Sequence, residues 1–286
     1  MSVERIETIA ALRGRLAESR RVGRRIGLVP TMGALHQGHA TLIGRARRDC
    51  DEVVVSIFIN PLQFDRKDDL DRYPRTLEAD VALCESAGVD VVFAPSATEM
   101  YPRPPRVTVQ VSQLDDQLCG KHRPGHFAGV ATVVMKLFQI VQADAAYFGE
   151  KDAQQLAIVR RLVADLNVPL AIIGVETVRE ADGLAMSSRN QHLHGSDRAI
   201  ATALYQALKT ARSAIEAGTR NPAQVRAAAL AHIPQDERLR LDYLDVVDPE
   251  SMQPVETIVQ PVIVAGALWV GTTRLIDNVR AVPSLS

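Results

Sequence analysis

The stretch that decides the fold is LVPTMGALHQGH, residues 28–39. Its apolar start predicts a buried strand, its glycines a turn, and residues 40–48 the helix that follows. A glycine-rich turn between a strand and a helix N-terminus offers unpaired backbone N–H groups and the positive end of a helix dipole. We therefore expect this turn to bind phosphate.

The spacing of the glycines nearly matches a P-loop, because four residues separate Gly33 from Gly38. A P-loop continues with Lys and then Ser or Thr, but this chain has His39 and Ala40. A nucleotide at this turn would therefore lack the P-loop lysine and the metal-binding hydroxyl. Histidine would supply the charge.

The composition fits a soluble globular protein with a sizeable core. The chain has 286 residues, of which 47% are hydrophobic and 23% are charged. The net charge of −1 gives no global field that attracts nucleic acid or an anionic membrane. Seven arginines cluster early, and we interpret them as a solvated face in preference to a polyanion site. They are Arg20, Arg21, Arg24, Arg25, Arg45, Arg47 and Arg48.

The cysteines and the N-terminus indicate a reducing cytoplasm. Cys50, Cys84 and Cys119 are odd in number, far apart and in no C-x-x-C pair, which argues against disulfides and structural zinc. We expect each to be a small buried residue and not a nucleophile. The N-terminus lacks the apolar segment of a signal peptide, and no apolar run approaches the ~18 residues of a membrane span.

Helical and extended patterns alternate from residue 1 to about residue 178, which predicts an α/β fold with a doubly wound parallel sheet. The continuous apolar run 53–60 is typical of a strand covered on both faces. The polar segment 65–75 predicts an exposed loop. The other expected helices are 3–19, 76–87, 127–141 and the one following 149–152; the other expected strands are 89–95, 107–111, 144–149 and 169–178.

The pattern changes after residue 178. A polar loop, 179–190, precedes two expected helices, 196–217 and 222–232, and three extended runs, 239–247, 261–270 and 273–279. Helices followed by strands predict a smaller α+β domain. We therefore expect two domains, 1–175 and 176–286.

Five short motifs resemble one known family. HQGH and MSSR resemble the two signatures of HIGH-type nucleotidyltransferases, the superfamily that includes class I aminoacyl-tRNA synthetases. More narrowly, five stretches resemble, in order and spacing, the motifs of the pantoate–β-alanine ligase (pantothenate synthetase) family. These are PTMGALHQGH (30–39), FINPLQF (58–64), RPGHFAGV (123–130), FGEKDAQQL (148–156) and READGLAMSSRN (179–190).

The resemblance implies a fold, a reaction and an assembly. The reaction is the ATP-dependent condensation of (R)-pantoate with β-alanine through pantoyl adenylate, giving pantothenate, AMP and pyrophosphate. The family uses Mg²⁺ and is typically a cytoplasmic homodimer. Residues 1–175 would form a Rossmann-like domain that binds the nucleotide and pantoate. Residues 176–286 would carry the MSSR loop, which closes over ATP.

The resemblance also implies roles for single residues. His36, His39 and Lys151 would be catalytic, with His39 as proton donor. The alternative for the two histidines is a capping or core pair, and the alternative for Lys151 is an exposed surface lysine. Asp152 is equally explained as a helix N-cap. The expected ATP-binding residues are Met32, Gly33, Ala34, Leu35, His36, Gln37, Gly38, His39, Gly149, Glu150, Lys151, Asp152, Val178, Met186, Ser187, Ser188 and Arg189.

Pantoate would bind Gln63 and Gln155, and β-alanine would bind near Gln63. Amide side chains suit a hydroxylated substrate because they bind hydroxyls without adding a competing charge. Asp80 is the candidate Mg²⁺-associated carboxylate, with an aspartate on a helix surface as the alternative. Four further pocket candidates have no assigned role: Asn60, Tyr73, Arg123 and His126.

Two alternative functions remain open at this point. One is another HIGH-type nucleotidyltransferase that acts on a phosphorylated substrate, against which Gln63 and Gln155 argue. The other is an RNA-binding module derived from a synthetase core. The net charge of −1 and the aromatic content of 4% argue against it, because RNA binding usually needs a basic surface and stacking platforms.

Overall fold

The computed structural model describes residues 3–65 and 67–284, and the contacts divide them into two compact units. The first unit holds the described residues up to Val111, together with Pro124–Glu150 and Ile158–Glu176. The second holds Ser112–Arg123, Lys151–Ala157 and the described residues from Thr177 onward. The division into domains at residues 175 and 176 stays a prediction, and two segments before it group with the second unit.

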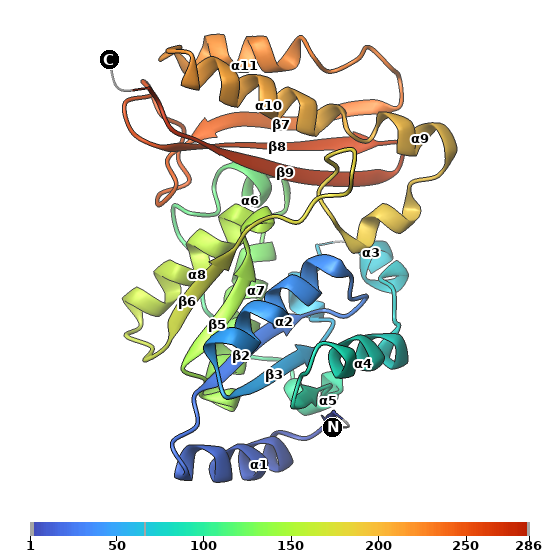
Figure 1. The fold of residues 1–286 in the computed structure, drawn as a ribbon, viewed down its shortest axis with the longest axis vertical. Helices are drawn as coiled ribbons and strands as arrows, with labels where there is room; N and C mark the ends of the chain where they lie inside the picture. The colour runs from blue at the N-terminus through green and yellow to red at the C-terminus, as the bar shows by residue number, and fades with distance from the viewer. Residues whose placement is uncertain (1–2, 66, 285–286) are drawn as a thin grey trace. The chain divides into compact units, whose positions relative to one another are not determined.

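Within the described residues, the first unit is built on a six-stranded parallel sheet with the order β1-β4-β3-β2-β5-β6 (Figure 1). The central strands are buried almost throughout, as their continuous apolar sequences predict. The Rossmann-like α/β fold expected from the sequence is therefore confirmed. The strands are β1 Glu4–Ile6, β2 Ile26–Thr31, β3 Glu52–Ile57, β4 Val91–Phe93, β5 Ala145–Gly149 and β6 Ala171–Val175.

Helices pack against the sheet through apolar stripes. Leu42, Ile43 and Ala46 of α2 join a buried cluster with the sheet residues Val29 and Val53. Helix α4 packs against α2, and α1 packs against α7. The helices are α1 Ile9–Arg21, α2 Gln37–Asp49, α3 Lys67–Arg72, α4 Leu77–Ser86, α5 Ala97–Met100, α7 His126–Val141 and α8 Ala153–Asp165, with short 3-10 helices η1 Pro61–Gln63 and η2 Glu150–Asp152.

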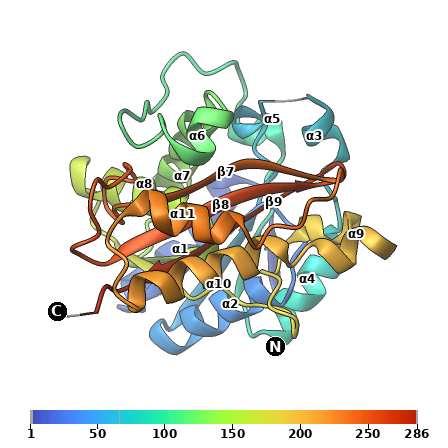
Figure 2. The same cartoon turned by 90° about the horizontal axis from the view of Figure 1, so that it is seen from above.

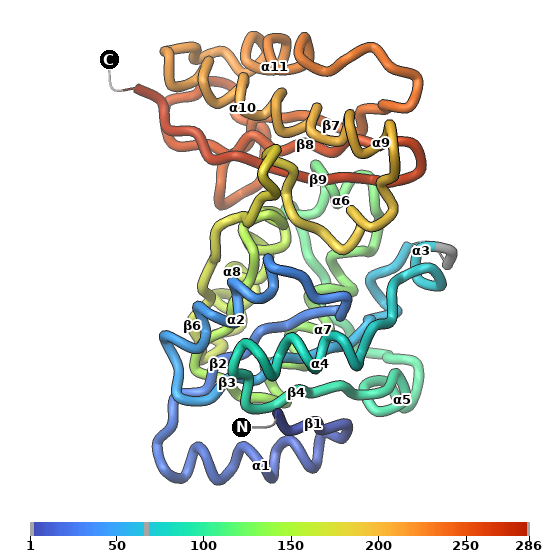
Figure 3. Tube along the Cα trace, turned by 45° about the vertical axis from the view of Figure 1, so that its right-hand side comes forward, coloured from blue at the N-terminus to red at the C-terminus, as the bar shows by residue number. Residues whose placement is uncertain are grey.

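The first expected helix, 3–19, is wrong at its start. Residues Glu4–Ile6 pair with β4 as the edge strand of the sheet (Figure 3). Helix α1 begins only at Ile9, because the side chain of Thr8 caps it by accepting from the backbone N–H of Ala11. Pairing with a strand some 85 residues away in sequence therefore overrides the helical pattern of the first few residues.

Two further expectations are also wrong. The predicted loop 65–75 contains the helix α3, although Arg66 lies outside the described residues. Residues 107–111, expected as a β-like run, form no strand and are mostly exposed. The expected helices 76–87 and 127–141 are confirmed as α4 and α7.

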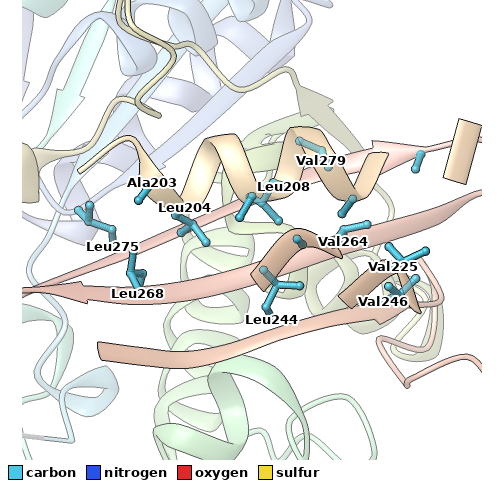
Figure 4. Packing of buried hydrophobic residues seen from close by; sticks show 14 of the residues in the cluster. Ala203, Leu204, Leu208, Val225, Leu244, Val246, Val264, Leu268, Leu275 and Val279 are labelled. Carbon is cyan, nitrogen blue, oxygen red and sulfur yellow. The ribbon is translucent and has the colours of Figure 1, made fainter. Parts of the chain in front are cut away.

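The second unit is an antiparallel sheet with the order β7-β8-β9 and two helices on one face (Figures 2 and 4). Leu204 and Leu208 of α10 pack on Val264 and Leu268 of β8. The elements are α6 Leu118–His122, η3 Ser188–His192, α9 Gly195–Ile200, α10 Ala203–Glu216, α11 Pro222–Leu230, β7 Leu239–Val247, β8 Val262–Val270 and β9 Thr273–Ala281. The α+β prediction is confirmed, but the single helix expected over 196–217 is broken into α9 and α10.

The other side of this sheet carries a smaller buried cluster, in which Leu118 of α6 packs on Tyr243, Ala265 and Ala267. All three cysteines are free and buried, as expected. Across the described residues, helices long and apolar enough to cross a membrane are absent.

Candidate active site

The turn between β2 and α2, residues 32–36, is called the signature turn below. It reverses direction through two consecutive residues in the left-handed region, Gly33 with φ of 82° and Ala34 with φ of 51°. The helix that follows begins with His36 as N-cap and His39 three residues later. Both histidine side chains are half-buried. The sequence therefore places the two histidines at the junction of a sheet and a helix N-terminus.

The first backbone N–H groups of the signature turn are hydrogen-bonded to side chains of Thr31 and Asp80. Gly33 donates to the Thr31 hydroxyl at 3.3 Å, and Ala34 and Leu35 donate to the carboxylate of Asp80 at 3.0 and 2.7 Å. The expectation of unpaired amides at this turn is therefore wrong for these three residues.

The two histidines cap the helix reciprocally. The Nδ1 atom of His39 accepts from the backbone N–H of His36 at 3.2 Å, and Nδ1 of His36 accepts from that of Gly38 at 3.1 Å. Because Nδ1 accepts in both rings, the ring proton lies on Nε2. The capping alternative is thus present in the structure. This capping makes each ring an Nε2–H donor.

Asp80, the candidate magnesium ligand, lies on α4 and is only 2% exposed. Besides the two turn amides, its carboxylate accepts from the hydroxyl of Thr76 at 3.2 and 3.3 Å. The alternative of a surface aspartate is wrong, and the residues around Asp80 do not fit a metal site. Among the described residues, no group of three or more His, Cys, Asp or Glu side chains is arranged to hold a metal ion.

A buried polar network surrounds Gln63, just beyond β3. Its Oε1 accepts from Nδ2 of Asn60 at 3.1 Å, and its Nε2 lies 2.9 Å from the sulfur of Met32. Nδ1 of His126 lies 2.6 Å from the backbone oxygen of Gln63. These four predicted site residues therefore come together in the first unit.

Tyr101 completes this network and was missed by sequence reasoning. Its hydroxyl donates to Oδ1 of Asn60 at 2.9 Å, and burial raises the pKa of Tyr101 to about 12, so that the hydroxyl keeps its proton. Its only sequence signal is a position in a proline-rich segment. The predicted candidate Tyr73 is buried and packs edge-on against Phe64, with ring centroids 5.7 Å apart.

The strand-to-helix turn after β5 divides between the units. Gly149 and Glu150 group with the first unit, and Lys151, Asp152 and Gln155 with the second. Nδ2 of Asn278 on β9 donates to the backbone oxygen of Lys151 at 2.9 Å. The side chain of Lys151 is 17% exposed, with its Nζ 3.9 Å from Oδ1 of Asp152, so it is not a freely exposed lysine.

The two neighbouring glutamines of this segment differ in setting. Gln154 is 6% exposed, and its amide accepts from the N–H of Gly120 and donates to the carbonyls of Leu114 and Gln117. Gln155 is half-buried. The structure therefore gives Gln154 a structural role and leaves Gln155 as the ligand candidate.

The second signature follows a short hairpin, residues 178–186. The N–H of Met186 donates to the carbonyl of Val178 at 2.9 Å, so two predicted ATP-site residues lie side by side. Ser187 caps η3 by accepting from the N–H of Arg189 at 3.3 Å. Ser188 is buried and Arg189 is half-buried.

Two arginines hold this hairpin. Arg179 forms a two-pronged ion pair with the buried Asp277 of β9, at 2.6 and 3.0 Å, and its guanidinium lies 4.0 Å from the centre of the Tyr205 ring. Arg198 bridges Glu180 and Asp182 at 2.7 and 2.6 Å. Hydrogen bonding to Arg198 holds the pKa of the Asp182 carboxyl below its ordinary value.

The fold and the signature turn together define a class, that of Rossmann-like proteins with a histidine signature at the carboxyl end of a central parallel strand. Such strand ends are where open α/β sheets bind ligands. The chain belongs to the pantoate–β-alanine ligase family, whose family model matches residues 4–280.

Similar proteins cover most of the chain. A pantothenate synthetase from Heliobacterium modesticaldum is 53% identical over 96% of this chain and 97% of its own length. The crystal structure of pantothenate synthetase from Thermus thermophilus has a TM-score of 0.93 and 45% identity, covering 98% of this chain and 100% of its own. The pantoate-beta-alanine ligase from Francisella tularensis, solved with "Beta-gamma ATP" and β-alanine, has a TM-score of 0.81 and 33% identity, covering 97% of each chain.

Some curated relatives are longer. The bifunctional pantoate ligase/cytidylate kinase of Thermosynechococcus vestitus is 55% identical over 262 residues, which make up 88% of this chain and 50% of the relative. The chain therefore spans about half the length of these bifunctional relatives.

Proposed function

We propose that the chain condenses (R)-pantoate with β-alanine at the expense of ATP, through a pantoyl-adenylate intermediate. The observation that carries this proposal is the family match over residues 4–280. The relative solved with an ATP ligand and β-alanine supports the same substrates. The family match argues against both alternatives, a nucleotidyltransferase for phosphorylated substrates and an RNA-binding module.

The first step of the proposed reaction forms the adenylate. An oxygen of the pantoate carboxylate attacks the α-phosphorus of ATP, and the bond from that phosphorus to pyrophosphate breaks. The protein contributes by orienting the two substrates and by stabilising the charge on the departing pyrophosphate. His36 and His39 suit the second task as Nε2–H donors, and Lys151 adds a positive charge.

The second step forms the amide. The amine of β-alanine attacks the acyl carbon, the bond from that carbon to AMP breaks, and the amine releases a proton. The fixed orientation of Gln63 suits the binding of pantoate hydroxyls, because Asn60 holds its oxygen and its Nε2 points toward the sulfur of Met32, a weak acceptor. We place β-alanine near Gln63 as well, and Gln155 as a second pantoate ligand.

The remaining assignments follow the family resemblance. We propose that ATP binds Met32, Gly33, Ala34, Leu35, His36, Gln37, Gly38, His39, Gly149, Glu150, Lys151, Asp152, Val178, Met186, Ser187, Ser188 and Arg189. Because the surroundings of Asp80 do not fit a metal ligand, we propose that Mg²⁺ arrives bound to the phosphates of ATP. The homodimer, the cytoplasmic location and the closing of the MSSR loop stay predictions.

An isotope experiment tests the adenylate directly. Pantoate labelled with ¹⁸O in its carboxylate is incubated with the protein, ATP, Mg²⁺ and β-alanine, and the products are analysed by mass spectrometry. We expect pantothenate together with AMP that carries one ¹⁸O atom. Formation of ADP with the label in inorganic phosphate would indicate an acyl phosphate and would overturn the proposal.

A further inference from the structure

The signature turn is shaped by a residue far away in the sequence. Asp80 lies about 45 residues after Ala34 and Leu35, yet its two carboxylate oxygens accept the backbone N–H groups of both. The hydroxyl of Thr76, one turn earlier on the same helix, donates to the same carboxylate. These donors are neutral, so the carboxylate forms charge-assisted hydrogen bonds, which are stronger than neutral ones.

We propose that Asp80 is a positioning residue for adenylation, which fixes the signature turn and through it the two histidines. This inference rests on the proposed function of the turn in binding ATP. It replaces the expectation that Asp80 binds Mg²⁺. Asp80 acts through the backbone N–H groups of Ala34 and Leu35.

The shape of the turn depends on this carboxylate. Ala34 adopts a left-handed backbone with φ of 51°, which carries a steric cost for a residue with a Cβ atom. The two amide hydrogen bonds to Asp80 offset this cost. A Cβ atom at Gly33 would lie 2.9 Å from Oδ2 of Asp80, so Gly33 is small because the carboxylate occupies the space.

The fixed turn sets the position of the rings. The N–H of Leu35 is held by Asp80, and the next N–H, that of His36, is held by Nδ1 of His39. The ring of His36 in turn accepts from the N–H of Gly38, and the two ring centroids are 4.2 Å apart. Movement at Leu35 would therefore move both Nε2–H donors together, because Leu35 is joined directly to the capping residue His36.

The neighbouring thiol of Cys84 carries no charge that would compete with the Asp80 carboxylate. Cys84 lies one helical turn further on, and burial together with the Asp80 carboxylate raises the pKa of the Cys84 thiol to about 12. The thiol therefore stays protonated and adds no second negative charge.

The test compares two acidic residues of the same helix. Asp80→Asn keeps the size of the side chain but leaves one oxygen for two amides, and Glu78→Gln is the control, since Glu78 is 87% exposed. The rate of pantoate-dependent pyrophosphate exchange is measured over a range of Mg²⁺ concentrations. Hydrogen exchange is followed in a peptide that covers the signature turn. His39→Ala is measured in parallel.

We expect Asp80→Asn to lower the exchange rate by about ten- to a hundredfold at saturating ATP, because small misplacements of substrate-positioning groups have effects of this size. Added Mg²⁺ should not restore the rate. The turn peptide should lose protection, and Glu78→Gln should match the unmodified protein. Asp80→Glu should also be defective, because the site is buried and a longer side chain would displace its carboxylate from the two amides.

Several results would overturn the inference. Restoration by Mg²⁺ would return Asp80 to the role of metal ligand, and an unchanged rate or unchanged protection of the turn would remove it as a positioning residue. If Asp80→Asn does not fold, the variant Thr76→Val serves as the test. We expect it to lower the exchange rate by about two- to fivefold, and an unchanged exchange rate would contradict the inference. A normal rate for His39→Ala would instead overturn the proposed function of the turn itself.

Discussion

The signature turn and the hairpin of residues 178–186 both adjoin a motif that the sequence predicts to bind nucleotide, but opposite kinds of groups hold them. In the turn, backbone N–H groups donate to the buried Asp80 carboxylate and to imidazole nitrogens. In the hairpin, the guanidinium groups of Arg179 and Arg198 bind carboxylates of which some are partly exposed.

This difference predicts different responses to conditions. Charge pairs near the surface weaken with salt and with acid, whereas buried amide–carboxylate bonds are screened much less. The first signature is therefore preorganised by its own fold. The second is held in part by the partly exposed pairs of Arg198 with Glu180 and Asp182, which ionic strength and pH can change.

The largest effect is expected at the turn. His39→Ala removes one Nε2–H donor and should lower the rate of adenylate formation by about 10²–10³-fold, the size typical of such groups. The fold should remain, because the change costs one helix-cap hydrogen bond, about 1 kcal/mol. Single-turnover formation of the adenylate measures the rate, with His232→Ala, an exposed histidine at the end of α11, as the control. A near-normal rate would remove His39 from the mechanism.

The hairpin should respond mainly in stability. Arg179→Lys keeps the charge but loses the two-pronged contact with Asp277 and the bond to the Gly183 carbonyl. We expect about 2 kcal/mol less stability in denaturant unfolding, together with a several-fold higher KM for ATP. Arg280→Lys, on the exposed end of the same strand, is the matched control. A loss of kcat at an unchanged KM would contradict this assignment.

The neighbouring glutamines of the second unit are expected to differ in role, with Gln155 binding substrate and Gln154 stabilising the fold. Gln155→Ala should raise the KM for pantoate more than the KM for ATP at unchanged stability. Gln154→Ala should lower the stability by about 1–3 kcal/mol, because buried partners lose their hydrogen bonds. Steady-state kinetics and thermal unfolding of both variants measure this. Equal effects of Gln155→Ala on both substrates would argue against a pantoate contact.

The smallest expected effect is a loss of hairpin stability at low pH. Because the pKa of Asp182 is lowered in the folded protein, its pair with Arg198 stabilises the fold above the ordinary pKa of 3.8, and that contribution is lost as the pH falls through the lower folded value. The exposed pair contributes below about 1 kcal/mol. After correction for the intrinsic pH dependence of amide exchange, the protection of residues 178–186 should therefore fall in acid, and Arg198→Gln should abolish this dependence. An unchanged pH dependence in Arg198→Gln would contradict the assignment to this ion pair.

Much of the fold could be predicted because its signals are local. The apolar runs that became β3 and β8 and the periodic helix α7 follow from patterns within a few residues. The edge strand β1 and the break between α9 and α10 were missed. For β1 the deciding pairing partner is β4, which lies far away in the sequence.

In the candidate site, too, local features could be predicted from the sequence and long-range contacts could not. Motif residues such as His36, His39 and Gln63 could be named from the sequence, because residue type and spacing carry their chemistry. The amide groups taken up by Asp80, and the hydroxyl of Tyr101 on Asn60, could not be named. Each of those contacts joins residues about 40 or more positions apart.

The most direct test of the proposed reaction is the exchange of labelled pyrophosphate into ATP with Mg²⁺ and pantoate but without β-alanine. Reversible formation of pantoyl adenylate predicts label in ATP only when pantoate is present. Absence of exchange in folded protein that binds ATP and forms pantothenate when β-alanine is added would contradict a free-standing adenylation step.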